Sequence, residues 1–76
     1  MQTKISELVE FKTIKIGDFI CTNEAIDPLL YVEVIGYVKK GKKIKDWTAD
    51  QDYVKVKNFR NHNSMIKMPE YVYKLI

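Results

Sequence analysis

The chain has one cysteine, two prolines and three glycines among its 76 residues, and it lacks any long apolar run. Cys21 has no partner for an internal disulfide, and no Asn-x-Ser/Thr acceptor is present, which favours a reducing, cytoplasmic setting. The longest apolar segment is interrupted by Glu33 and is too short to span a bilayer. No charged region followed by an apolar stretch opens the chain, so we expect no signal peptide.

Motifs for catalysis and for metal binding are also missing. The sequence contains no glycine-rich phosphate loop, no Ser/His/Asp set and no pair of catalytic carboxylates. The aspartates between Asp46 and Asp52 lack the alternating spacing and the closing glutamate of an EF-hand loop. Cys21 and His62 are too isolated for a structural zinc site, which needs about four ligands. We therefore expect a non-enzymatic protein with no metal and no cofactor.

What is present is ordinary for one globular domain. Apolar residues make up 46% of the chain and charged residues 30%, and nine aromatic residues argue against disorder. The length leaves room for one domain, residues 1–76. A chain this short buries only about 60% of the surface that it exposes when unfolded, so we expect a thin core.

The net charge of +3 hides an asymmetry between the two halves of the chain. Residues 1–38 carry three lysines and six acidic residues, and their formal charge is −3. Residues 39–76 carry nine lysines, one arginine and four acidic residues, and their formal charge is +6. Such an asymmetry can steer a polyanion towards one side of the molecule, unless folding brings the two halves together.

The first twelve residues are open to two interpretations. Ile5, Leu8 and Val9 stand at helical spacing, with Thr3 or Ser6 available as a helix cap, and this predicts a short N-terminal helix or an irregular arm. An N-terminal strand is the competing interpretation.

The rest of the chain reads as short strands separated by turns. Residues 13–22 form a strand bent at Gly17-Asp18, and a loop ending at Pro28 follows. Residues 29–38 form the central strand, bent at Gly36. Its alternation places these residues in the core: Leu30, Val32, Val34 and Val38. The opposite, outward face carries Tyr31, Glu33, Ile35 and Tyr37.

Three further strands are predicted after a basic turn around Gly41. Residues 44–52 are a polar connection, and residues 53–57 form a strand with Val54 and Val56 inward. The three asparagines of residues 58–64 tolerate the left-handed turn conformation and predict a hairpin tip. Residues 64–68 form the next strand with Ile66 inward. A turn at Pro69, readable as one 3₁₀ turn, precedes a last strand over residues 73–76.

Five short strands with regularly spaced turns predict an all-β fold, a small barrel or sandwich. The segments IKIGDFICT, YVKVK and SMIKMPEYVYKLI follow one another in an order that resembles the SH3-like small barrels, which include KOW and Tudor modules. The resemblance covers residues 14–76 and implies a five-stranded SH3-like barrel. The chain lacks the Gly-Pro of KOW modules and the aromatic cage of Tudor domains, so no functional residue is carried over.

The strongest local signal for function is the density of basic residues. Five lysines crowd into the basic turn, and the following strand and hairpin tip add further cations; the candidate nucleic-acid contacts are Lys39, Lys40, Lys42, Lys43, Lys45, Lys55, Lys57 and Arg60. Flexible ammonium groups suit phosphate contacts, which supply affinity without reading a base sequence. The competing interpretation is a solvated loop whose charge is partly neutralised by the three aspartates that follow it.

Three aromatic residues lie among these cations and could stack on bases: Tyr37, Trp47 and Tyr53. The alternative is that the tyrosines pack as cross-strand pairs and that Trp47 covers the core. Together the charges and the aromatics predict a binding module for DNA or RNA, or for a protein of a nucleic-acid-handling complex, with no membrane contact. The alternative is a protein-interaction module that docks through its aromatic face or a strand edge. Its small size would also fit a phage-encoded regulator.

Overall fold

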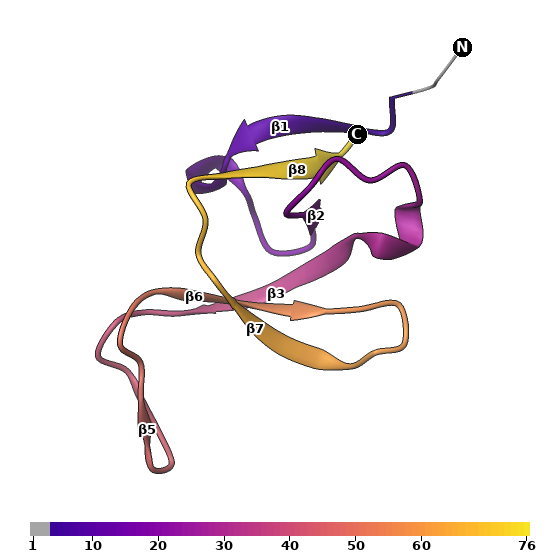
Figure 1. Ribbon diagram of the computed structural model, residues 1–76. Coiled ribbons are helices and arrows are strands. Elements are labelled where there is room, and N and C mark those ends of the chain that lie inside the picture. The colour runs from indigo at the N-terminus through magenta and orange to yellow at the C-terminus, as the bar shows by residue number, and fades with distance from the viewer. Residues whose placement is uncertain (1–3) are drawn as a thin grey trace.

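The structure is a computed structural model that describes residues 4–76, and it is all-β, as predicted. Six antiparallel strands form one sheet in the order β1–β8–β2–β3–β6–β7 (Figure 1). Their bounds are β1 (Ser6–Glu10), β2 (Phe19–Cys21), β3 (Val32–Val38), β6 (Tyr53–Lys57), β7 (Asn63–Lys67) and β8 (Tyr71–Leu75). A separate two-stranded sheet pairs β4 (Lys43–Ile44) with β5 (Trp47–Thr48).

The sheet does not close on itself among the described residues, so the closed five-stranded barrel is not formed. Strand β1 pairs with β8 alone and strand β7 pairs with β6 alone, which leaves one free edge at each end of the strand order. Strands β2, β3, β6 and β7 follow one another as neighbours, and β8 returns to pair with β2.

The N-terminal helix is not formed; the competing strand interpretation describes residues 6–10. Strand β1 pairs with β8 in the register Ser6↔Leu75 to Glu10↔Tyr71. Alternation along β1 then directs Val9 towards the core and leaves Leu8 55% exposed on the other face. The apolar residues that looked helical are therefore divided between two faces of a strand. A 3₁₀ helix, η1 (Phe11–Thr13), follows, and Thr3 lies outside the described residues.

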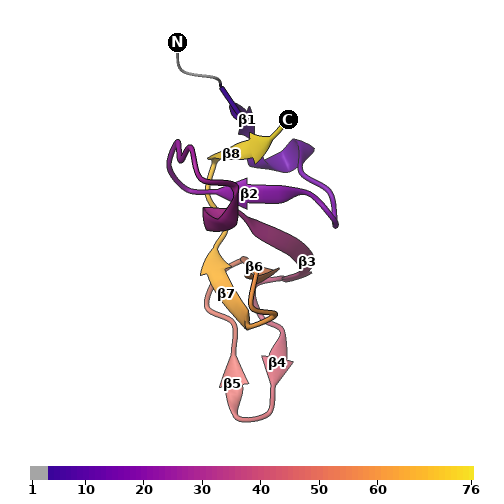
Figure 2. The same cartoon turned by 90° about the vertical axis from the view of Figure 1, so that its right-hand side faces the viewer.

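The core lies on one face of the sheet and draws residues from almost every strand. Its buried members are Phe11, Ile14, Ile20, Val34, Val54, Val56 and Val72. The predicted inward positions of Val54 and Val56 are confirmed, and Ile66 and Val32 pack against the same cluster. Outside this cluster, Ser6, Tyr31 and Val38 are also buried. Figure 2 shows the sheet from the side, with the strands following one another from β1 to β7.

A β-bulge in the central strand changes which side chains reach the core. The register runs Val34↔Val56 and then Gly36↔Lys55, so Ile35 is the extra residue. One extra residue inverts the alternation, and paired residues share a face. Tyr37, opposite Val54, therefore packs against the core, whereas Val38, opposite Tyr53, is buried on the other side of the sheet. The predicted outward orientation of Tyr37 is wrong for this reason.

Three other predictions are corrected. Residues 28–30 form a second 3₁₀ helix, η2 (Pro28–Leu30), in which the Asp27 carboxylate accepts the backbone N–H of Leu29 at 2.9 Å. Leu30 is consequently 59% exposed instead of inward, and Tyr31 is 2% exposed instead of outward. The turn between β7 and β8 is a bend at Glu70 rather than a 3₁₀ turn.

The hairpin tip between β6 and β7 has the expected chemistry. Asn61 adopts a left-handed conformation with φ of 64°, and the Asn58 side chain accepts the backbone N–H groups of Arg60 and His62.

Among residues 4–76, no helix is long and apolar enough to cross a membrane.

Candidate nucleic-acid interface

The basic turn belongs to a protruding hairpin, residues 39–52, which we call the lysine arm. It leaves the sheet between β3 and β6 and contains β4 and β5 (Figure 2). Backbone hydrogen bonds hold its base, from Gly41 N–H to the Ala49 carbonyl at 2.8 Å and from Ala49 N–H to the Lys42 carbonyl at 2.9 Å. Gly41 has φ of 90°, a left-handed value that glycine adopts without steric cost. The arm is thus an ordered hairpin instead of a polar connection.

Two of the three aspartates accept hydrogen bonds that stabilise the lysine arm. The Asp52 carboxylate accepts the backbone N–H of Lys40 at 2.8 Å, and the Asp50 carboxylate accepts the hydroxyl of Tyr53 at 2.6 Å. The hydrogen bond from Tyr53 is the largest influence on Asp50 and lowers the pKa of its carboxyl group below the ordinary 3.8. The Asp50 carboxylate stays ionised at neutral pH, and both carboxylates hold the hairpin through these hydrogen bonds.

The lysines of the arm are exposed and form no ion pair with any residue from 4 to 76. All five, Lys39, Lys40, Lys42, Lys43 and Lys45, are exposed. Residues 4–76 contain three ion pairs, Lys12–Glu10, Lys57–Glu33 and Lys74–Asp18, and none includes a lysine of the arm. Five lysines and three aspartates leave the arm with a formal charge of +2. A hairpin of this kind can approach a phosphate backbone without breaking an existing ion pair.

Two of the three candidate aromatics meet at the base of the arm. The rings of Trp47 and Tyr53 lie with their centroids 5.4 Å apart at an interplanar angle of 60°. Trp47 remains 37% exposed, so part of the indole is open to a partner while Tyr53 supports it. The third aromatic, Tyr37, is elsewhere: it donates to the Ile14 carbonyl at 3.2 Å and packs edge-on against Phe11.

The remaining candidate cations are spread along β6, away from the arm. Lys55 lies on the outer face, with its aliphatic stem over Gly36. Lys57 lies 3.8 Å from the carboxylate of Glu33, and Arg60 stacks over Phe59 at the tip of the β6–β7 hairpin. Strands rise about 3.3 Å per residue, so Arg60 is on the order of 20 Å from the start of β6. The structure therefore brings together the five lysines of the arm but not Arg60.

One basic residue was missed by the sequence reasoning. Lys67 pairs with Tyr53 across β6 and β7, and its charge acts on Asp50 at the base of the arm. The asparagine-rich tip could have predicted the position of Lys67, because a hairpin centred on residues 58–62 sets the register that places Lys67 opposite Tyr53.

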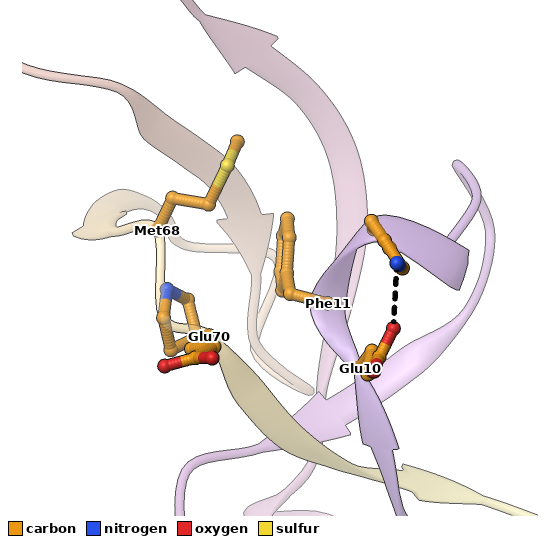
Figure 3. Close-up of a pocket in the computed structure, with 6 residues that line it drawn as sticks. Glu10, Phe11, Met68 and Glu70 are labelled. Carbon is orange, nitrogen blue, oxygen red and sulfur yellow. Dashed lines mark ion pairs between the residues drawn. The ribbon is translucent and has the colours of Figure 1, made fainter.

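The opposite end of the molecule is unsuited to a polyanion. A hollow of about 290 Å³ beside the end of β1 is lined by Glu10, Phe11, Lys12, Met68, Pro69 and Glu70 (Figure 3). Its one lysine is paired with Glu10 at 3.0 Å, and Glu70 adds a second carboxylate. The lysine arm and strand β1 lie at opposite ends of the molecule (Figure 2).

Comparisons with family models, with curated protein sequences and with solved structures found no match for this chain.

Proposed function

We propose that the protein is a non-enzymatic module that binds nucleic acid through the lysine arm. The observation that carries this proposal is the set of five exposed lysines on an ordered hairpin, none of them ion-paired within residues 4–76. Contacts from lysine to phosphate are insensitive to base sequence, so the binding would be largely sequence-independent and strongly dependent on salt. Trp47 would add stacking on an unpaired base.

Two further expectations accompany this proposal. The meander of β2, β3, β6 and β7, with β8 returning to β2, supports the resemblance to SH3-like barrels, although the sheet is open. The lone half-buried Cys21 supports a reducing, cytoplasmic setting.

The experiment is a salt titration of binding to a labelled single-stranded oligothymidylate. The affinity should fall linearly with salt on logarithmic axes, with a slope of about −0.7 for each phosphate contacted. Replacing Lys39, Lys40, Lys42 and Lys43 by alanine should make that slope shallower by about 3, because four contacts are removed.

A matched variant separates the arm from net charge. Alanine at Lys4, Lys12, Lys15 and Lys74 lowers the charge by the same four units but leaves the arm intact. It should retain most of the slope. Absence of binding at low salt, or equal loss in both variants, would refute the proposal.

The second candidate function is a protein-interaction module, and the structure limits the surfaces through which it could bind a partner. The expected aromatic face is not assembled, because Tyr31 is buried and Tyr37 packs against the core. A strand edge remains free at β7, among the residues that the structure describes.

A further inference from the structure

Strand β7 is an exposed edge of the sheet. It pairs with β6 over the whole range from Asn63 to Lys67 and has no partner on its other side among the described residues. All of its residues except Ile66 are exposed. A regular, uncovered edge is a template on which an extended chain can pair.

The hydrogen bonds that bracket β7 show which of its backbone groups are free. Asn58 N–H bonds to the His62 carbonyl at 3.0 Å, and Met68 N–H bonds to the Asp52 carbonyl at 3.2 Å. Hydrogen-bonded pairs alternate along an antiparallel ladder, so the even-numbered residues of β7 face β6. The backbone N–H and C=O groups of Asn63, Met65 and Lys67 therefore point away from the sheet.

Two hollows flank this edge, one on each face. The outer hollow, of about 490 Å³, is lined by Ile35, Lys55, Asn63, Ser64 and Met65. The other, of about 190 Å³, opens on the core side and is mainly apolar; its lining includes Ile20, Leu30, Val32, Val56 and Ile66. Side chains of an added strand would alternate between these two hollows.

The charge and polarity of the two hollows indicate which side chains an added strand should carry. On the outer face, Lys55 stands opposite Met65, and Lys67 stands opposite Tyr53 at the end of the strand. The outer hollow has a lysine and no carboxylate in its lining, whereas the core-side hollow has no charged residue. The complement is a strand with carboxylates on one face and aliphatic side chains on the other.

We propose that the β7 edge binds an extended peptide of alternating acidic and apolar residues by strand addition. The peptide would pair with the free groups of Asn63, Met65 and Lys67, direct its carboxylates towards Lys55 and Lys67, and direct its apolar side chains into the core-side hollow. Main-chain hydrogen bonds supply affinity in this mode, and the alternating contacts supply specificity. This proposal does not depend on nucleic-acid binding by the lysine arm.

The test uses the full ¹⁵N-labelled chain and an eight-residue peptide of alternating glutamate and valine. Binding should shift the amide signals of Asn63, Met65 and Lys67 and slow their hydrogen exchange. The same peptide N-methylated on every amide of its pairing side keeps its side chains but cannot pair, and it should not bind. A lysine–valine peptide should bind at least about tenfold more weakly, because like charges would meet on the outer face.

Two variants locate the site. Met65→Pro removes an outward N–H without removing a bond to β6, a substitution that edge strands tolerate, and it should abolish binding while the fold is kept. Lys55→Glu combined with Lys67→Glu should reverse the preference, so that the lysine–valine peptide binds more tightly. This reversal distinguishes loss of the site from loss of the fold.

Four results would overturn the proposal. These are equal binding by the N-methylated peptide, signal changes confined to the lysine arm, protection of the β7 amides by oligothymidylate in place of peptide, and protection that rises with protein concentration alone. The third would assign the edge to nucleic acid, and the fourth to a second copy of the chain.

Discussion

The hydroxyl of Tyr31 lies 2.7 Å from Oγ of Ser6, and both residues are buried. The same phenol donates to the Ala25 carbonyl at 2.6 Å, so the Ser6 hydroxyl donates to the phenol oxygen. This pair joins strand β1 to the loop before β3, two segments separated by 25 residues. The two hydrogen bonds together give a partner to the Tyr31 phenol, the Ser6 hydroxyl and the Ala25 carbonyl, which all belong to buried residues.

Tyr31→Phe should therefore destabilise the fold. Removing the phenol oxygen leaves the Ser6 hydroxyl and the Ala25 carbonyl buried without their partner, which costs about 1–3 kcal/mol. Urea unfolding followed by circular dichroism measures this as a lower midpoint. Tyr71→Phe is the matched control, because Tyr71 is 51% exposed, and it should change the free energy of unfolding by less than about 0.5 kcal/mol. Equal effects of the two substitutions would contradict the assigned role.

Tyr37 and Trp47 should respond differently to truncation, although both were predicted as contact residues. Tyr37→Ala removes a ring packed against Phe11 and Val54 and should lower the free energy of unfolding by about 2–3 kcal/mol. Trp47→Ala removes one edge-on pair at the base of the arm and should cost about 1 kcal/mol. Trp47→Ala should weaken oligothymidylate binding while the sheet stays folded, as checked by denaturation beside the salt titration.

A smaller loss of stability for Tyr37→Ala than for Trp47→Ala would contradict the exchange of faces at the bulge. Gly36 alone is not the reason for that exchange. A side chain at this position would meet the stem of Lys55 at 3.6 Å, which is ordinary contact. The inversion comes from the extra residue, Ile35.

Period-2 alternation predicted strand types and most core positions but could not predict the bulge. Val34, Val54 and Val56 follow the pattern, because no irregularity precedes them in their own strands. Within β3, the faces predicted beyond Ile35 are exchanged, since the bulge depends on a register with β6 that lies almost twenty residues away in the sequence. A resemblance in strand order carries no information about such a shift.

The lysine cluster was predictable from the sequence, but the partners that Asp50 and Asp52 find in the fold were not. Adjacent opposite charges suggested partial neutralisation. In the folded chain these two carboxylates accept hydrogen bonds from the Tyr53 hydroxyl and the Lys40 backbone, and three-dimensional pairing decides which partner a carboxylate finds. The choice between helix and strand for β1 was also left open by the sequence, because its partner, β8, lies at the other end of the chain.

Lys45 stands at the tip of the arm in a left-handed conformation, with φ of 54°. A side chain with a Cβ pays a steric penalty of about 1–2 kcal/mol there, and glycine does not. Lys45→Gly should therefore raise the stability of the arm by about 1 kcal/mol, whereas Lys45→Val should lower it because β-branched residues avoid this region. Hydrogen exchange at the amides of Gly41 and Ala49, which close the base of the arm, measures both effects. Faster exchange in Lys45→Gly would contradict the prediction.

Asp50 should make the stability of the lysine arm depend on pH. The Tyr53 hydroxyl lowers the pKa of the Asp50 carboxyl group below 3.8, so its ionised form is favoured by folding. The contribution is present above the unfolded value and is lost as the pH falls through the lower, folded pKa. Tyr53→Phe should return the pKa of Asp50 towards 3.8 and slightly destabilise the arm at neutral pH. The difference in arm stability between this variant and the unsubstituted chain should vanish in acid. Carboxyl ¹³C titration and exchange at Ala49 follow the two effects. Asp46→Asn removes a nearby exposed carboxylate and should change neither, so an equal shift in that variant would show that general charge, and not the Tyr53 hydrogen bond, sets the pKa of Asp50.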